Sequence, residues 1–173
     1  GAQIISSTFG PGPGGSVRVT ASDTLTLAGG APNDTFASGI LATTEGTDMG
    51  AGAAGSIVVS APHILVTDGA AISGSTFGPG VGGSVMVTAS DTLTLAGTTP
   101  TGRFSSILAT TRGTAEGAGA AGSIVVSAPH ILVTDGAQIS SSTFGPGAGG
   151  SVMVTASDTL TLTGAAPTGR LSG

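Results

Sequence analysis

The stretch GAGAAGSIVVSAPHILVTDGA occupies residues 50–70 and occurs again, without a change, at residues 117–137. A second stretch, GSVMVTASDTLTLAGTTPTGRFSS at residues 83–106, returns at residues 150–173 with five substitutions. The chain therefore has a long repeat of 67 or 68 residues. Near-identical units at a fixed period are typical of solenoids, in which each unit buries its hydrophobic face against its neighbours.

A shorter period lies within the long one, because a Gly-Ser pair opens each β-rich phrase. The glycines of these pairs are Gly15, Gly55, Gly83, Gly122 and Gly150. Successive phrases are 40, 28, 39 and 28 residues apart, so long and short coils are expected to alternate. We expect one β-helix unit over residues 1–173, with coils at about 1–14 (partial), 15–54, 55–82, 83–121, 122–149 and 150–173 (partial).

Within each coil, the aliphatic side chains follow a period of two, which indicates short β-strands. In the short coils Ile57, Val59 and Ala61 face inward from a first strand, Ile64 and Val66 from a second, and Ile72 and Thr76 from a third. The equivalent residues of the long coils are Val17, Val19, Ala21, Leu25, Leu27, Ile40 and Thr44. Three inward ridges per turn predict an all-β fold, a right-handed parallel β-helix with three short strands per coil.

The composition fits this prediction. Glycine accounts for 32 of 173 residues, Trp, Tyr and Cys are absent, and 39% of residues are hydrophobic. An ordinary core, in which aromatic side chains supply much of the buried area, is therefore not expected. Collagen is excluded because a strict Gly-X-Y period is absent, and disorder is disfavoured by the regular hydrophobic pattern. An antiparallel sandwich remains an alternative, although near-identical coils would stack in it only by accident.

The extra length of the long coils falls in two insertions. The first contains APNDTFASG at residues 31–39 and TTPTGRF at residues 98–104, which are rich in the Pro and Gly typical of turns. The second adds four residues, TDMG at 47–50 and TAEG at 114–117. We expect both to be surface loops at the corners of a solenoid that keeps its strand registers.

The charges argue against nucleic acid as a partner. Nine acidic residues, four arginines and no lysine give a net charge of −5. The arginines, Arg18, Arg103, Arg112 and Arg170, are dispersed along the chain, whereas recognition of a phosphate backbone needs clustered cations. The absence of cysteine removes thiol chemistry but does not identify the compartment.

No membrane-spanning helix is expected. The uncharged stretch at residues 69–90 consists mostly of Gly, Ser, Thr and Pro, whereas a spanning helix needs roughly 20 predominantly apolar residues. The first residues, GAQIISSTFG, lack the basic and apolar regions of a signal peptide. We expect the chain to begin within a repeat.

Two phrases carry a family resemblance: AGSIVVSAPHILVTDGAAISGSTFGPGVGGSVMVTA at residues 54–89 and GGSVRVTASDTLTLAG at residues 14–29. The chain resembles, over essentially its whole length, the coils of filamentous-haemagglutinin-like large exoproteins, the adhesins of two-partner secretion. Most distinctive is Gly-Ser-Ile-x-Val followed by Asp-Gly-Ala and Ser-Thr-Phe-Gly-Pro-Gly in one coil. The amino-terminal secretion domain of that family is missing from this sequence.

The resemblance implies a secreted, extracellular or cell-surface location, of a Gram-negative-type bacterium, and a role as a long stalk with an adhesive surface. The chain would cross the outer membrane unfolded, through a partner barrel. Its partners would be flanking coils of the same protein or other subunits end to end, and host or surface receptors or glycans.

Two sets of recurring residues are candidates for chemistry. His63 and His130 could form a metal site, but at ~4.8 Å per coil they would be nearly 10 Å apart, too far to share one ion. Asp23, Asp91 and Asp158 could serve a polysaccharide-degrading β-helix enzyme. Hydrolysis needs two carboxyl groups in different environments, roughly 5–9.5 Å apart, whereas the repeats give these acids identical environments.

We therefore expect the histidines to lie at solvated corners and these aspartates to be turn residues that accept backbone N–H bonds. Asp68 and Asp135 each precede a glycine, which indicates a turn. The Gly-Pro-Gly loops at residues 10–12, 78–80 and 145–147 contain no Asp for calcium and no Gly-Lys-Ser/Thr for a nucleotide. The sequence predicts no catalytic, cofactor-binding or metal-binding residue, and no enzyme.

Aromatic and threonine rows leave two alternatives open. Phe9, Phe77 and Phe144 recur in short coils, where Glu45 and Arg112 take the aligned positions of long coils. We expect these rings to cover a corner or to pack under an inserted loop near Phe36 and Phe104. An exposed aromatic row that binds carbohydrate is the alternative.

Outward Thr-x-Thr pairs suggest an ice-binding face. The pairs are Thr24 and Thr26, Thr92 and Thr94, and Thr159 and Thr161, with His63, Leu65 and Thr67 interrupting them in a short coil. An ice-matched face needs the pair in every coil, so this alternative is weaker. The sequence favours a structural or adhesive segment of a secreted cell-surface adhesin or extracellular fibre, without catalytic activity. An ice-binding or carbohydrate-binding β-solenoid is the alternative, and a polysaccharide-degrading β-helix enzyme has less support.

Overall fold

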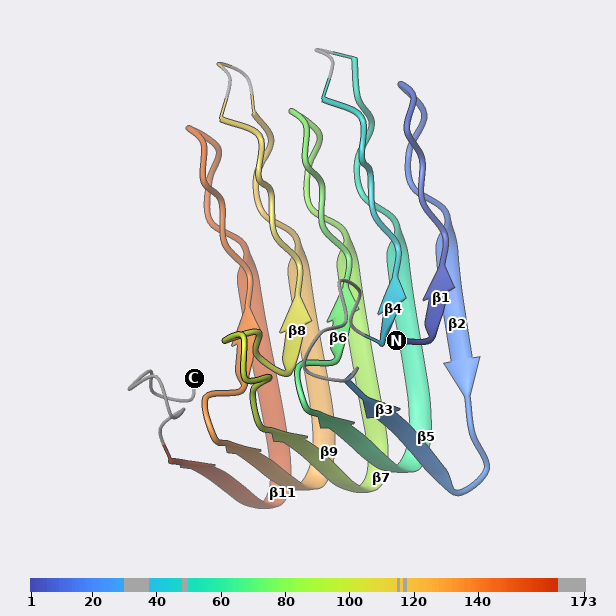
Figure 1. The fold of residues 1–173 in the computed structure, drawn as a ribbon, viewed down its shortest axis with the longest axis vertical. Helices are drawn as coiled ribbons and strands as arrows, with labels where there is room; N and C mark the ends of the chain where they lie inside the picture. The colour runs from blue at the N-terminus through green and yellow to red at the C-terminus, as the bar shows by residue number, and fades with distance from the viewer. Residues whose placement is uncertain (30–37, 48–49, 115, 117, 165–173) are drawn as a thin grey trace.

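The computed structural model describes residues 1–29, 38–47, 50–114, 116 and 118–164. The described chain is all-β, and its strands are parallel and lie in two sheets (Figure 1). The strands are β1 Gln3–Ile5, β2 Ser16–Thr20, β3 Thr24–Ala28, β4 Gly39–Leu41, β5 Ser56–Thr67, β6 Ala71–Ser73, β7 Ser84–Ala96, β8 Ser106–Leu108, β9 Ser123–Thr134, β10 Gln138–Ser140 and β11 Ser151–Thr163.

The large sheet contains the strands that open each coil, in the order β11-β9-β7-β5-β2, with β3 also paired to β5. Its register aligns the serine that follows each Gly-Ser glycine. These residues are Ser16, Ser56, Ser84, Ser123 and Ser151. The spacing read from the sequence is therefore the spacing of the stacked strands, and the parallel stacking excludes the antiparallel sandwich.

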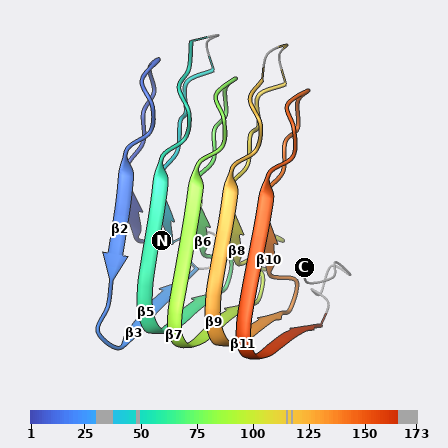
Figure 2. The same cartoon turned by 180° about the vertical axis from the view of Figure 1, so that it is seen from behind.

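The small sheet has the order β1-β4-β6-β8-β10. Its strands have three residues each, and beyond them a row of bridged threonines continues the pairing from coil to coil. The row consists of Thr8, Thr44, Thr76, Thr111 and Thr143. Seen from behind in Figure 2, the small sheet lies across the coils from the large one.

The division into strands differs from the prediction. We expected separate first and second strands, but in β5, β7, β9 and β11 the two are one continuous strand with a register shift. The shift arises because Pro62 alone lies between paired residues of β5, whereas Ser90 and Asp91 lie between their partners in β7. The additional residue acts as a β-bulge, which bends a strand without ending it.

The core consists of aliphatic ladders that run along the stack. Ile57, Val85 and Ile124 are aligned in register and almost completely buried. Ile40, Ile72 and Ile107 form the facing ladder on the small sheet and have no exposed surface. The inward residues predicted from the period of two are thus buried in the central strands, whereas Val19, Leu25 and Leu27 of β2 and β3 are half-buried.

Beyond the threonine row, each coil narrows into an arm in which the outgoing and returning chain twist about each other (Figure 1). Backbone bonds join neighbouring arms: Ala54 N–H donates to Val81 O and Gly82 N–H to Ala120 O, both at 2.9 Å. A Cβ on Gly83 would overlap the carbonyl oxygen of Gly55 on the adjacent coil. The high glycine content therefore has a packing cause, since the arms stack backbone against backbone.

Candidate functional site

The corner of the large sheet carries the two histidines. Strand pairing aligns His63 with Thr92 and Thr92 with His130, so one coil separates the histidines, as their spacing predicted. Nδ1 of His63 lies 2.9 Å from Oγ1 of Thr92 and 3.4 Å from Oδ2 of Asp91. Among the described residues, no three His, Cys, Asp or Glu side chains gather where they could hold a metal ion.

The prediction for Asp91 and Asp158 was partly wrong. Both lie at the corner, but inside the long strands β7 and β11 rather than in turns. Within the described chain their carboxylates face a histidine of the preceding coil: Asp158 Oδ2 lies 3.4 Å from His130 Nδ1. The extra residue of the bulge explains the difference, because it turns the aspartate toward the neighbouring coil instead of toward a backbone N–H.

The Asp-Gly dipeptides form the predicted turns. Asp68 and Asp135 both have φ of 54°, and the glycines that follow them have φ of 81°. Ala70 N–H closes the first turn by donating to Thr67 O at 3.0 Å. Two successive positive φ angles are those of a type I′ turn, for which Asp-Gly is a preferred sequence.

The two insertions have different outcomes. Residues 98–104 form a small antiparallel hairpin, with Thr98 bridged to Phe104 and Thr99 N–H donating to Arg103 O at 2.8 Å. This confirms a turn-like loop at that corner. The corresponding loop at residues 31–39 and the four-residue insertions lie largely outside the described residues, and so does Phe36.

The threonine face retains the interruption read from the sequence. Thr26 aligns with Leu65, Leu65 with Thr94, and Thr94 with Leu132, so threonine and leucine alternate from coil to coil. A shallow cavity of about 270 Å³ lies over this face and is lined by both kinds of side chain. The regular threonine lattice that ice binding requires is absent from this described face.

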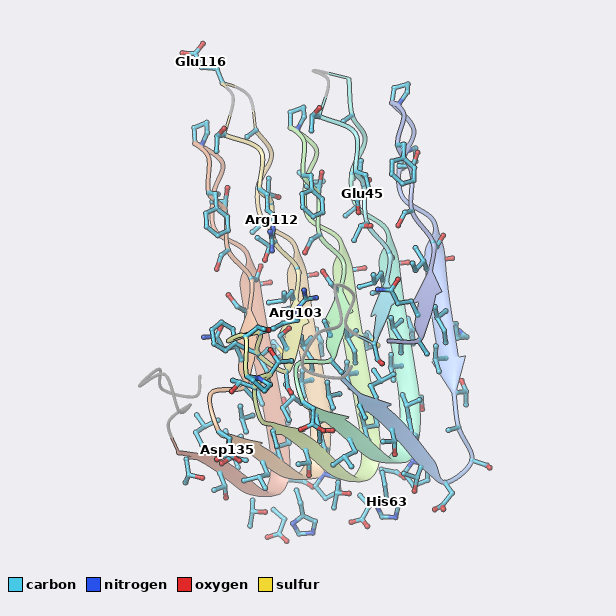
Figure 3. The ribbon with its side chains drawn as sticks, in the orientation of Figure 1. Glu45, His63, Arg103, Arg112, Glu116 and Asp135 are labelled. Carbon is cyan, nitrogen blue, oxygen red and sulfur yellow. The ribbon has the colours of Figure 1, made fainter. Side chains whose placement is uncertain are left out.

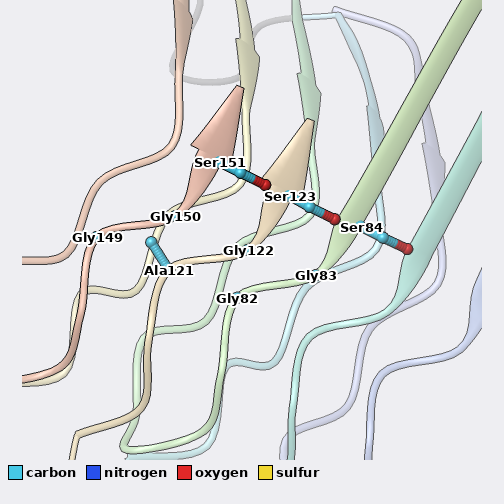
Figure 4. A pocket seen from close by; sticks show the side chains of 9 residues that line it. All are labelled: Gly82, Gly83, Ser84, Ala121, Gly122, Ser123, Gly149, Gly150 and Ser151. Carbon is cyan, nitrogen blue, oxygen red and sulfur yellow. The ribbon is translucent and has the colours of Figure 1, made fainter. Parts of the chain in front are cut away.

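A wider groove of about 510 Å³ runs along the Gly-Ser phrases (Figure 4). The hydroxyl groups of Ser84, Ser123 and Ser151 point the same way along it. Its floor is backbone, because Cβ atoms on Gly122 and Gly150 would overlap the carbonyl oxygen of the preceding coil. The groove thus follows from the packing of the coils, and it contains no charged side chain.

The outer side of the small sheet, which we call the small-sheet face, carries apolar, hydroxyl, aromatic and charged side chains together. Alternate residues of each coil point outward there: Leu41, Thr43 and Glu45; Ser73, Ser75 and Phe77; Leu108, Thr110 and Arg112; and Ser140, Ser142 and Phe144. The bridged threonines fix this register, so Glu45, Phe77, Arg112 and Phe144 form one row across four coils. The alignment of phenylalanine with charged residues predicted from the sequence is confirmed.

The phenylalanines of this row, which we expected to cover a corner or to pack under an inserted loop, are exposed. Phe77 is 38% exposed and Phe144 68% exposed. Phe104 lines a cavity together with Phe77, as expected.

Arg112 stacks on the row. Its guanidinium carbon lies 5.2 Å from the centroid of the Phe77 ring, within the range of a cation–π contact. Arg103, on the hairpin, lines the same cavity, and Figure 3 shows both arginines on this side of the molecule, far from His63. The sequence did not predict that Arg103 and Arg112 line one cavity, because the arginines were compared only by their separation along the chain.

Two cavities lie on the small-sheet face. One, of about 410 Å³, extends from Glu45 to Arg112 and includes Arg103. The other, of about 240 Å³, extends from Arg112 to Phe144. Buried hydroxyl groups form part of their floor, among them Ser75 and Thr110. The face thus combines aromatic rings, hydroxyl groups and charge in one groove.

Comparison with known proteins adds no family. No protein-family model matches the chain, and neither the curated proteins nor the solved structures contain a significant match. No helix long and apolar enough to cross a membrane occurs in the described part of the chain.

Proposed function

We propose that the chain is a structural segment of a secreted, extracellular adhesive fibre, folded as a right-handed parallel β-helix and without catalytic activity of its own. The observation that supports this proposal is the repetition of one backbone pattern from coil to coil. Ala42 N–H donates to Ser73 O, Gly74 N–H to Leu108 O and Ala109 N–H to Ser140 O, at 3.0, 2.9 and 3.2 Å. A stack of this kind gains length with each repeat while its cross-section stays the same.

The resemblance to filamentous-haemagglutinin-like exoproteins supports the proposed extracellular location. In that family such coils form surface stalks, and export proceeds through an outer-membrane partner. A chain without cysteine is compatible with that route, because it forms no disulfide before export. The proposal therefore places the protein at the bacterial surface, end to end with further coils.

The carboxylates give polysaccharide hydrolysis less support. Asp91 and Asp158 each lie 3.4 Å from the Nδ1 atom of a histidine, in the same geometry. A glycosidase needs one carboxyl group that holds a proton and one that does not, and identical environments do not separate them. We therefore rank this function below the fibre.

Removal of one long repeat tests the proposal. Deletion of residues 69–135 joins Asp68 to Gly136 and restores the same Asp-Gly turn, since the φ angles of both turns agree. The stack should shorten by two coils, about 10 Å at the spacing of sheet strands. Small-angle X-ray scattering measures the length, and circular dichroism measures the β content.

A tandem copy of residues 69–135 inserted at the same point is the matched control and should lengthen the stack by the same amount. A deleted chain that unfolds, or a length that does not follow the number of repeats, would contradict the fibre. Location is tested separately: antibody against the segment should label intact cells that make the parent protein, and labelling only after permeabilisation would argue against a surface fibre.

A further inference from the structure

We propose that the small-sheet face binds a carboxylate-bearing polysaccharide and that Arg112 holds the carboxylate of one sugar. The proposal deepens the adhesive role proposed above and rests on it for its biological setting. A structural fibre requires no ligand site, so a polysaccharide bound at this face would be a further property of the protein.

Arg112 is the centre of the site because it is shared by the two cavities of the face. Phe104, Ser106 and Leu108 are the other residues that line both cavities. A chain-like ligand could therefore lie across Arg112 with one sugar on each side of it. A compact ligand would need only one of the two cavities.

The guanidinium of Arg112 is available to a ligand. Its described contact is the stack on Phe77, and no hydrogen bond or ion pair joins its nitrogens to another described residue. Stacking on a ring holds the planar group in one orientation and leaves its N–H donors in the plane free to point outward. Two parallel N–H donors match the two oxygens of a carboxylate.

The surroundings of Arg112 suit a sugar. The exposed ring of Phe144 offers a flat apolar surface for the C–H side of a sugar ring, and the half-buried Phe104 lines the same cavity, as in ligand sites that combine aromatic walls with a few polar groups. Ser140 and Ser142 are 2.8 Å apart and joined by a hydrogen bond, and Gln138 adds an amide. Hydroxyl and amide groups both donate and accept, as sugar hydroxyls require.

Glu45 makes the two ends of the site differ in charge and so orients a bound ligand. It lies two coils from Arg112 in the same row, about 10 Å at the sheet spacing, and it accepts a hydrogen bond from Thr43 Oγ1 at 2.9 Å. A carboxylate ligand is repelled at the Glu45 end and attracted at the Arg112 end. Sugar hydroxyls can donate to Glu45, so a ligand that carries both groups fits better than a simple anion.

An acidic peptide fits the face less well. Peptides gain affinity by adding a strand to a free sheet edge, but β6 and β8 are each paired on both sides. Nucleic acid needs many cations along its backbone, whereas this groove is lined by Arg103 and Arg112 together with Glu45. A polysaccharide needs only a surface that contacts its rings, hydroxyls and carboxylate.

The test compares polygalacturonate oligosaccharides with their methyl esters, which keep the rings and lose the charge. Isothermal titration calorimetry with the 173-residue chain should detect binding of the acid form and at least about tenfold weaker binding of the ester. Arg112→Gln should weaken binding of the acid form by about tenfold. Arg112→Lys should fall between, because it keeps the charge and loses the paired donors.

Arg18→Gln is the matched control, since Arg18 is an exposed arginine on β2 of the large sheet, and it should leave the affinity unchanged. Amide chemical shifts of the unaltered chain provide a second measurement: the perturbed residues should lie at 41–45, 73–77, 103–112 and 138–144. Equal binding of acid and ester, an unaffected Arg112→Gln variant, or shifts confined to the large sheet would overturn the proposal. Polyglutamate that displaces the sugar with equal affinity would assign the face to acidic peptides instead. None of these outcomes alters the length of the rod, so they leave the fibre proposal to its own test.

Discussion

Nδ1 of His63 lies 2.9 Å from Oγ1 of Thr92 and 3.4 Å from Oδ2 of Asp91, both on the next coil of the stack. The repeat places His130 in the same relation to Thr159 and Asp158, at 3.0 and 3.4 Å. An imidazole from a short coil thus meets an Asp-Thr pair from a long coil at the bend of the large sheet. All of these charged or ionisable side chains are between 42% and 63% exposed, so water screens their attraction.

The corner should therefore contribute little to stability. His63→Ala and Asp91→Asn should each lower the free energy of unfolding by at most about 1 kcal/mol, the range for exposed pairs. Urea melts measure the change, and the double variant shows whether the two effects are coupled. A loss above about 2 kcal/mol from either single change would mean that the corner is a structural element. Zinc should leave the melting temperature unchanged, whereas a tightly bound ion at 100 times its dissociation constant would add about 2.7 kcal/mol.

The register of the first strand predicts opposite outcomes at adjacent positions. Ile124 is completely buried, while Val125 faces outward and is half-buried. Ile124→Asp would place a carboxylate among aliphatic side chains and should cost several kcal/mol. Val125→Asp should cost no more than about 1 kcal/mol, the span of strand propensity. Equal losses in urea melts would contradict the register.

The sequence predicts the parts of this fold that repeat. Ile57 and Val59 alternate with outward residues, and Asp68 precedes a glycine, so local pattern and turn chemistry were sufficient for the inward rows and the type I′ turn. The continuous, bent strands of the large sheet were not predicted. The bend arises because one residue of a short coil lies opposite two residues of the next long coil at the corner. That difference becomes visible only when Pro62 and Asp91 are aligned on neighbouring coils.

The small-sheet face depends on relations that no local pattern contains. The position of Phe77 beside Arg112 follows from the alignment of Thr76 with Thr111, and this alignment was predicted. The stacking of the Arg112 guanidinium on the Phe77 ring depends on a side-chain conformation. The position of Arg103 in the cavity beside them depends on the conformation of the hairpin. Neither property has a period along the chain.

The Asp-Gly turn predicts a further contrast. Asp68 has φ of 54°, a left-handed conformation that asparagine adopts readily and a β-branched residue does not. Asp68→Asn should change the free energy of unfolding by less than about 0.5 kcal/mol. Asp68→Val should lower it by about 1–2 kcal/mol. Thermal melts of both variants test the turn, and a valine variant as stable as the asparagine variant would argue against it.

Two glycines of the arms provide the last contrast. A Cβ on Gly122 would overlap the carbonyl oxygen of Gly83, which belongs to the backbone of the adjacent coil and cannot rotate away as a side chain can. A Cβ on Gly149 meets no atom within 4 Å, and Gly149 does not have a positive φ. Gly122→Ala should therefore force the coils apart and lower the free energy of unfolding by at least about 1–3 kcal/mol, as overpacking does. Gly149→Ala should leave stability unchanged or raise it by about 0.4–1 kcal/mol, because alanine restricts the unfolded chain. Urea melts of the two variants compare them directly, and a Gly122→Ala variant as stable as Gly149→Ala would mean that the arms do not stack backbone against backbone.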